Sequence, residues 1–521
     1  MSIALSWQSR LILAVISVLV FVMNIDYTAV NLALVPISEE IAGDLNTLQW
    51  LLSAYVLVWA AFVVPGGRLA DLHGKKKILI MGLVLFMLGS GLTGVGVDIT
   101  TLILGRLLQG LGAALFSAPA YGLIFSSVPP AKQGMAMGVI GGASGLGLAI
   151  GPTLAGLIIR ETSWRWLFYI NIPLCLIIIG VLIFLTPKEE KATSHTPIDW
   201  ASVGLLACGL GTTVFSLNQS EVWGITDWRF IGLIILSLSV LVVFFLRDRQ
   251  QQLQILPVAL LKNKSFMATV GASFLYSYCF ALVLIMMSLY LQNTLHLNSS
   301  ETGYVFLSMT LAVGILSPIG GKLADRIGVC IPMITGALLI AIALFLLSFL
   351  TRTSSLWMVC GGLMLAGLGL GIGFPSLNTA MFRTLDSQEI NTGSGIFTMA
   401  MMIANSVSVI ISTSFLVMIG RTKLTSLVQQ SHLSLDFQQQ EMLAQVISKV
   451  EHTSAQLQEF TPTQVPQLLQ FIDNSFLQGF KATLWIGLVF SLICAGLVYC
   501  YLRHLPQQKP MNDALGVGSM H

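Results

Sequence analysis

Long, uninterrupted apolar stretches recur along the whole chain, and they restrict its fold more than any other feature. A helix that crosses a lipid bilayer needs about 20 mostly apolar residues. Stretches of that length are found at roughly 11–35, 47–66, 77–97, 101–127, 134–159, 164–186, 199–219, 228–246, 266–291, 302–320, 331–351, 355–380, 390–419 and 479–502. Because they are continuously apolar and not alternating, they predict an all-α polytopic membrane protein with fourteen transmembrane helices rather than a β-barrel.

The scarcity of charge supports this prediction. Charged side chains make up 9% of the 521 residues, whereas soluble domains carry about 25%. This excludes a soluble enzyme, and no Ser/His/Asp, metal-ligand or phosphate-loop pattern points to a membrane enzyme. The net charge of +3 is too small and scattered to predict a nucleic-acid partner. The seven cysteines lack ligand spacing, so we expect neither disulfides nor a metal site.

Basic residues are distributed unevenly between the predicted loops. With the N-terminus inside, seventeen fall in cytoplasmic segments, whereas the short outer loops hold Arg160, Arg165, Arg229 and Arg352. An excess of Lys and Arg marks the cytoplasmic side of a membrane protein. We therefore expect both chain termini in the cytoplasm.

The sequence G-x-L-A-D-x-x-G occurs twice, at Gly67–Gly74 and at Gly321–Gly328. Both copies follow an even-numbered span, which predicts a duplicated six-helix unit with an extra helix pair between the copies. The expected division is a six-helix bundle at 1–190, an inserted pair at 191–250, a second six-helix bundle at 251–505 and a cytoplasmic tail at 506–521.

A polar segment at 420–478 is rich in Gln and Ser and carries apolar residues at helical spacing. We expect it to form one or two short helices on the outer face. These helices are either a solvated cap or a docking surface for a partner protein.

Two ionisable residues, Asp26 and Arg106, fall clearly inside predicted spans, where charge is costly and marks function. Asp26 lies about 22 Å above the cytoplasmic start of the first span, and Arg106 about 8 Å below the outer start of the fourth. In a core about 30 Å thick these depths coincide. Burial disfavours an ionised carboxylate and a guanidinium favours it, so the pair predicts proton or cationic-substrate coupling. The alternative is a static salt bridge.

The repeated loop motif predicts a conformational latch. Gly67 and Gly74 allow a tight link between two helices, and Lys75 begins a basic run suited to anionic headgroups. Asp71 is expected to pair with a basic side chain or to cap a helix N-terminus. Asp325 and Arg326 are the expected counterparts in the second copy. The alternative is that the basic residues of this loop only fix the orientation of the chain in the membrane.

The span at 134–159 is dense in glycine, and it includes Gly151, Pro152 and Gly156. Small residues at four-residue spacing allow close helix contact, and a proline bends the helix.

Together these motifs resemble the major facilitator superfamily, specifically its fourteen-span drug:proton antiporters of the EmrB/QacA type. Gly67–Lys77 resembles motif A, with Leu72 where an arginine is usual; Leu104–Gly110 resembles motif B; and Gly147–Gly156 resembles the antiporter motif C. Asp26–Leu34 and Trp164–Pro173 resemble two stretches typical of the fourteen-span group.

The resemblance implies a proton-driven exporter of amphipathic drugs in the bacterial cytoplasmic membrane, working by alternating access. The proton gradient would be the energy source, with no cofactor, and a periplasmic membrane-fusion adaptor would be a partner. Spans 1, 4, 9 and 12 would line the substrate cavity. Candidate cavity residues are Asn24, Asn31, Tyr55, Trp59, Tyr121, Tyr276, Phe280, Phe374 and Asn378; for the aromatic ones the alternative is ordinary packing.

Two other transport functions remain open from the sequence. One is a dedicated exporter of a single metabolite, such as a siderophore, on the same fold. The other is a proton-coupled importer, against which the Gly151-Pro152 pair of the antiporter motif argues.

Overall fold

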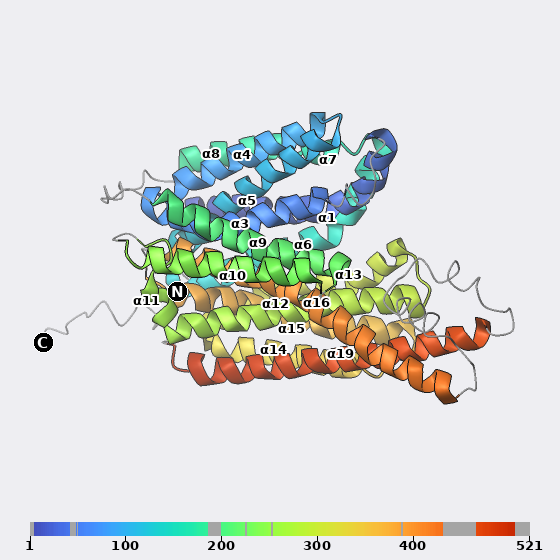
Figure 1. Cartoon of the computed structure of the whole chain (residues 1–521). Coiled ribbons are helices and arrows are strands. Elements are labelled where there is room, and N and C mark those ends of the chain that lie inside the picture. The colour runs from blue at the N-terminus through green and yellow to red at the C-terminus, as the bar shows by residue number, and fades with distance from the viewer. Residues whose placement is uncertain are drawn as a thin grey trace, which may run out of the picture.

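The computed structural model describes residues 5–41, 48, 50–185, 199–224, 227–251, 254–386, 389–430 and 465–505. Regular structure in these ranges is helical, and the long helices run side by side along one direction (Figure 1). The predicted boundary at 190/191, the tail at 506–521 and the middle of the 420–478 segment, at 431–464, lie outside the described residues.

The N-terminal set of helices, α1 to α8, occupies the upper part of Figure 1. It comprises α1 (Trp7–Ile41), α3 (Trp50–His73), α4 (Lys75–Val95), α5 (Ile99–Ser127), η1 (Pro130–Lys132), α6 (Gln133–Glu161), α7 (Trp166–Tyr169) and α8 (Asn171–Leu185). The next two helices are α9 (Trp200–Trp223) and α10 (Trp228–Asp248).

The C-terminal set, α11 to α19, lies below in the same view. It comprises α11 (Val258–Lys262), α12 (Lys264–Leu289), η2 (Tyr290–Thr294), α13 (Ser299–Ile327), α14 (Cys330–Leu347), α15 (Leu356–Arg383), α16 (Ile390–Gln430) and α19 (Val465–Leu502). The start of α1 and the end of α19 lie at the same end of the molecule (Figure 1).

Thirteen helical stretches among the described residues are long and apolar enough to cross a membrane. They correspond to thirteen of the predicted spans, so the prediction of an all-helical, multi-pass membrane protein is confirmed. The remaining predicted span, at 134–159, forms the continuous helix α6 but is not among the thirteen. The number fourteen therefore stays a prediction.

At both ends of the 420–478 segment the residues extend long helices, and the expectation of short helices for its middle, at 431–464, lies outside the described residues. Residues up to Gln430 continue α16, and residues from Val465 begin α19, so these helices have 41 and 38 residues. The reason is a narrow apolar stripe within the polar composition: Leu424 and Val428 of α16 are buried, as are α19 side chains at the same level. The two helices pack against each other along their length.

Glycines bring α4 and α5 into close contact in the N-terminal set. A Cβ atom on Gly82 would lie 2.7 Å from the backbone nitrogen of Phe116, and one on Gly89 would lie 2.6 Å from that of Gln109. Any larger residue would push the helices apart. The contact holds the polar faces of α4 and α5 together beside α1.

The most extensive contacts between the N-terminal and C-terminal sets are those of α6 with α13 and of α3 with α16, and α15 and α5 add to these two seams. The helix α9 lies against both α3 and α16, and α10 lies outside it against α9. The inserted pair thus lies beside one of the two seams between the sets.

Candidate functional site

A buried ion pair joins α1 and α5. Arg106 Nη1 donates a hydrogen bond of 2.7 Å to Asp26 Oδ2, and the two side chains are 0% and 1% exposed. The predicted matching depth of these two residues is therefore a direct contact. Because both side chains are shielded from water, each charge stabilises the other, and removing either one would leave an uncompensated buried charge.

Arg106 is held by three elements at once. Its Nε donates to the carbonyl of Leu51 in α3 at 2.9 Å, and Nη1 also donates to Gln109 Oε1 at 2.9 Å. The guanidinium lies 4.3 Å from the centre of the Tyr55 ring. Its Nη2 is buried with no hydrogen-bond partner among the described residues. A planar fork with several fixed partners is geometry that lysine cannot reproduce.

Sequence reasoning did not assign the second donor set on Asp26. Asn171 Nδ2, at the start of α8, donates to Asp26 Oδ1 at 3.0 Å, and Gln109 Nε2 approaches the same oxygen at 3.4 Å. Asn171 also donates to Ser90 Oγ in α4 at 3.0 Å. Gln109 lies in the Leu104–Gly110 motif and Asn171 in the Trp164–Pro173 motif. An uncharged polar residue within an apolar stretch was the sequence feature that could have pointed to them.

Replacing Arg106 with lysine is expected to lower transport about tenfold or more. A lysine ammonium can keep the pair with Asp26 but cannot also reach Leu51 and Gln109, and one lost charge-assisted hydrogen bond accounts for roughly a factor of ten. Initial export rates in membrane vesicles measure the effect. Arg160→Lys is the matched control, since Arg160 pairs with Glu161 on the surface. Unchanged rates for Arg106→Lys would reduce the residue to packing.

The carboxylate of Asp71 caps the N-terminus of α16, in the other helix set. It accepts bonds from the backbone nitrogens of Asn391 and Thr392 at 3.1 and 2.7 Å, and from their side chains at 2.7 and 2.6 Å. A helix N-terminus offers unpaired N–H groups and positive potential to an anion. The sequence left two arrangements open for Asp71, an ion pair with a basic side chain and a cap on a helix N-terminus, and the structure shows the cap.

Asp325, in the second copy of the motif, does the same for α6. It accepts from the backbone nitrogens of Gly134 and Met135, at 2.8 Å each. Its basic partner is Arg383 of α15 at 3.5 Å, whereas Arg326, the other expected residue of this motif copy, is exposed. Arg326 is one residue further along the helix, so it lies about 100° away from the face that meets α6.

The motif glycines explain the close approach at both caps. A Cβ on Gly67 would collide with the carbonyl of Asn391, and one on Gly321 with the carbonyl of Gly134. Gly74 and Gly328 have φ values of 97° and 87°, which favour glycine, and they separate α3 from α4 and α13 from α14. Lys75, next in sequence, donates to Ser126 Oγ at 3.4 Å.

Charged residues surround the Asp71 cap. Arg68 of α3 interacts electrostatically with Asp71, Glu389 and Asp248. Burial raises the pKa of Glu389, which directly precedes α16. Asp248 ends α10 and accepts bonds from the backbone nitrogens of Ile255 and Leu256 at 2.8 and 3.0 Å. The inserted pair is thereby connected to the charges around this cap.

The glycine-rich helix α6 has two packing faces. Gly147 and Gly151 lie against α1, where a Cβ on Gly151 would collide with Thr28 Oγ1. Gly138 and Gly142 lie against α13 instead. Gly156 has nothing within 4 Å of its Cβ position, so the structure does not support the expected packing role for it. The side chain of Pro152 lies outside those described.

The candidate cavity residues divide into two groups. Six are half-buried: Asn24 of α1, Trp59 of α3, Tyr121 of α5, Phe280 of α12, and Phe374 and Asn378 of α15. The four aromatic ones pack against the hydrophobic core, so their cavity role stays a prediction. The amides of Asn24 and Asn378 donate to carbonyls of their own helices, and Trp59 Nε1 donates to Ser117 Oγ at 3.2 Å. The side chain of Asn31 lies outside those described.

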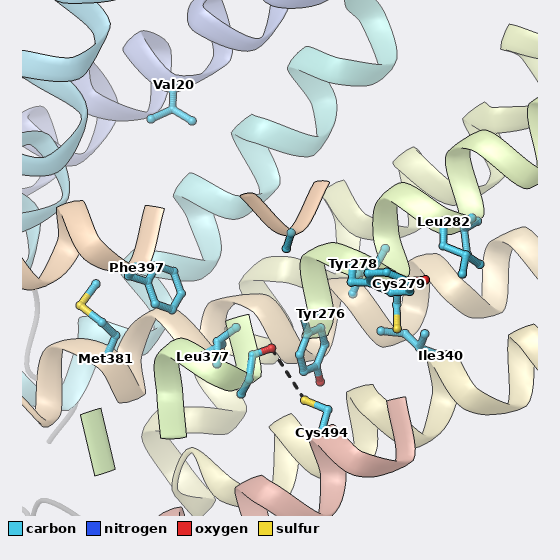
Figure 2. Packing of buried hydrophobic residues seen from close by; sticks show 14 of the residues in the cluster. Val20, Tyr276, Tyr278, Cys279, Leu282, Ile340, Leu377, Met381, Phe397 and Cys494 are labelled. Carbon is cyan, nitrogen blue, oxygen red and sulfur yellow. Dashed lines mark hydrogen bonds between the residues drawn. The ribbon is translucent and has the colours of Figure 1, made fainter. Parts of the chain in front are cut away.

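Tyr55 and Tyr276 differ from this group. Tyr55 is fully buried against Arg106. Tyr276 lies within the C-terminal core near Cys494 and Ile340 (Figure 2), and its hydroxyl donates to the carbonyl of Met333 at 2.5 Å. That bond uses the only donor of the tyrosine, so the structure places Tyr276 in the packing of α12 against α14 rather than in a cavity wall.

Comparison with known proteins identifies the class. A family model of the Major Facilitator Superfamily matches residues 16–409, so the chain belongs to this superfamily. It is therefore a multi-pass membrane transporter. The resemblance inferred from the motifs is confirmed at this level, and the narrower fourteen-span EmrB/QacA type stays a prediction.

Several curated proteins are similar over most of the chain. The multidrug transporter protein MdtP of Bacillus subtilis is 28% identical over 386 residues, covering 74% of this chain and 71% of its own. The tetracenomycin C resistance and export protein of Streptomyces glaucescens is 28% identical, covering 69% and 68%. The riboflavin transporter RibZ of Clostridioides difficile is 27% identical, covering 74% and 83%.

Solved structures support the fold. The human organic anion transporter MFSD10 superposes with a TM-score of 0.61 at 14% identity, covering 94% of this chain and 99% of its own. The proton:xylose symporter XylE gives a TM-score of 0.59 at 12% identity, covering 94% and 95%. At such identities the likeness shows the major facilitator fold alone.

Proposed function

We propose that this transporter is a proton-coupled antiporter that exports amphipathic small molecules by alternating access. The observation that carries the proposal is the fully buried Asp26–Arg106 pair, a carboxylate that can take up a proton beside a guanidinium that cannot lose one. Proton uptake by Asp26 would release Arg106 and change the packing between α1, α3 and α5. The exporters among the relatives support the direction of transport.

In the proposed transport cycle, the contacts that open and close are the two aspartate caps. They connect the N-terminal and C-terminal sets at one end of the molecule, through Asp71 on α16 and Asp325 on α6. The excess of basic residues at this end supports a cytoplasmic location for it. In this state the cytoplasmic ends are held together, and alternating access requires both caps to break before substrate can enter from the cytoplasm.

The remaining features of the proposal follow from the sequence. We place the protein in the bacterial cytoplasmic membrane with fourteen spans, α6 included, and both termini inside. The bundles at 1–190 and 251–505 would move about the inserted pair at 191–250. The proton gradient would drive transport without a cofactor, and the segment at 420–478 would provide the contact for a periplasmic adaptor. Deleting residues 431–464 without loss of export would argue against that adaptor.

Proton flux in proteoliposomes tests the function. The purified full-length protein is reconstituted with a pH-sensitive dye inside, and ethidium is added as an amphipathic cationic probe. Antiport predicts proton movement opposite to ethidium, and an imposed pH gradient should drive ethidium accumulation. Proton movement in the same direction as ethidium would indicate symport, and ethidium transport with no proton movement would contradict proton coupling.

A dedicated exporter of one compound is the second candidate. Two relatives carry the name of a single compound, tetracenomycin C and riboflavin. Drug susceptibility of a deletion strain, measured beside the metabolites in its medium, separates the candidates. Broad sensitivity supports the multidrug function, and loss of one secreted metabolite supports the dedicated one.

A further inference from the structure

The two oxygens of the Asp26 carboxylate have different partners. Oδ2 receives the bond from Arg106, whereas Oδ1 receives its shorter bond, of 3.0 Å, from Asn171. Asn171 comes from α8 and is 1% exposed. A carboxylate that already has a guanidinium partner thus depends on an uncharged amide for its second oxygen.

The Asn171 amide is itself fixed in place. It is the first residue of α8, directly after the short helix α7 and Ile170. Its Nδ2 makes a second bond, to Ser90 Oγ, and Ser90 donates in turn to the carbonyl of Phe168 at 2.8 Å. Ser90 is 0% exposed. The chain from Asp26 through Asn171 and Ser90 ends on the α7 backbone and sets where the amide points.

Chemistry separates Asn171 from Arg106. A guanidinium has donors but no acceptor, so it can donate to Asp26 but cannot accept a hydrogen bond from the O–H of the protonated form. A side-chain amide carries both an NH₂ group and a carbonyl oxygen. If the Asn171 amide turns over, its oxygen accepts a bond from the protonated carboxyl, and the Ser90 hydroxyl can rotate to match.

We propose that Asn171 is a positioning residue for the proton-coupling carboxylate: it donates a charge-assisted bond to Oδ1 of the ionised form, and it accepts a weaker, neutral bond from the carboxyl once that is protonated. This rests on the proposed proton-coupled function, and it adds the residue that stabilises both charge states of the site. Ser90 supports it by holding the amide, and Gln109, at 3.4 Å from the same oxygen, supplements it.

The other titratable groups that face Asp26 are few. Arg106 comes from α5, Tyr55 from α3 and Cys175 from α8. The phenol and the thiol are neutral near pH 7 from their ordinary values, and α4 and α6 add no titratable side chain among the described residues that contact the carboxylate. Among these residues, Arg106 is thus the charged group that faces Asp26, and the remaining donors are neutral.

The test follows the protonated carboxyl of Asp26 directly. Infrared difference spectra of the full-length protein in lipid vesicles show its carbonyl band, which is assigned by its absence in Asp26→Asn. Asn171→Leu fills the same space without the donor, so the pH midpoint of the band should move up by about one unit, a tenfold change in proton binding. Asn171→Asp adds a second carboxylate and should move it further up.

Two further variants complete the experiment. Ser90→Ala leaves Asn171 in place but frees its amide, so a smaller upward shift is expected, and this variant keeps the test open if Asn171→Leu fails to fold. Ser237→Ala is the matched control, because Ser237 is buried and bonded to Gly209 O in the inserted pair, away from Asp26. A merely structural role of Asn171 would lower protein yield without moving the midpoint.

The outcomes separate this inference from the proposed function. An unchanged midpoint in both Asn171→Leu and Ser90→Ala would overturn the positioning role even if ethidium still drives proton flux. A wild-type band that titrates while ethidium moves no protons would overturn the antiport function. A wild-type band that never appears at any pH would overturn both.

Discussion

Proton-driven ethidium accumulation is expected to fall about 100-fold in Asp26→Asn, because the only proton-binding group of the buried pair is removed. Coupling between two sites is commonly worth factors of 5 to 150, so loss of the coupling group should remove an effect near the top of that range. The asparagine has the size of aspartate but carries no charge and takes up no proton. Initial rates in proteoliposomes with an imposed pH gradient measure the loss.

The structure adds a second expectation for this variant. With Asp26 neutral, Arg106 remains buried without its counter-charge, and removing one partner of a buried pair is strongly destabilising. Asp26→Asn/Arg106→Gln removes both charges and controls for this effect. Ethidium exchange without a pH gradient should persist in at least one of the two variants. Wild-type accumulation in Asp26→Asn would place the coupling site elsewhere.

The second large effect is expected at the aspartate caps, which lie on the cytoplasmic side in the proposed orientation. Asp71→Ala removes four hydrogen bonds that join α3 to α16. Charge-assisted bonds are worth more than neutral ones, and a few kcal/mol shifts a two-state equilibrium by roughly 100-fold or more. The population with separated cytoplasmic ends should therefore rise from minor to dominant, and net export should fall at least tenfold.

Spin labels on cysteines at His73 and Asp386, both exposed, report the separation of α3 from the start of α16. Asp71→Ala should lengthen this distance, and Asp325→Ala should do so less, because Asp325 accepts two backbone bonds and faces Arg383. Asp199→Asn is the control: Asp199 is ionised, with a pKa lowered to about 2 by its bonds with Arg247, and both residues belong to the inserted pair. An unchanged distance in Asp71→Ala/Asp325→Ala would mean that the caps do not hold this state.

The features that could be predicted from the sequence are those with a large free-energy cost or gain in the membrane. Apolar runs of spanning length predicted the helices because burying backbone in lipid leaves few alternatives. Asp26 and Arg106 stood out because a charge in an apolar run is costly, and their depths follow from the rise of a helix. The Asp71 cap was one of two predicted arrangements, since a carboxylate in a helix link suits either a cation or a helix N-terminus.

The features that sequence reasoning missed depend on tertiary contacts. Asn171 and Gln109 are uncharged, so nothing in the sequence shows that both meet Asp26 across α1, α5 and α8. Arg383 of α15 forms the ion pair with Asp325. Arg326 does not, because one residue along a helix changes the direction of the side chain by about 100°. Tyr276 was assigned to a cavity as an aromatic in a lining span, yet its hydroxyl points at the α14 backbone.

The caps also determine how the closed cytoplasmic end responds to salt. Each joins a carboxylate to backbone nitrogens at 2.7 to 3.1 Å within packed helix ends. These distances are far below the Debye length of about 8 Å at physiological ionic strength, and counter-ions cannot enter between the partners. The lysines of the basic run after Gly74 are half-buried or exposed, so salt can screen them. In the proposed orientation, high salt should thus weaken their attraction to the membrane surface while the contact between the two helix sets stays closed.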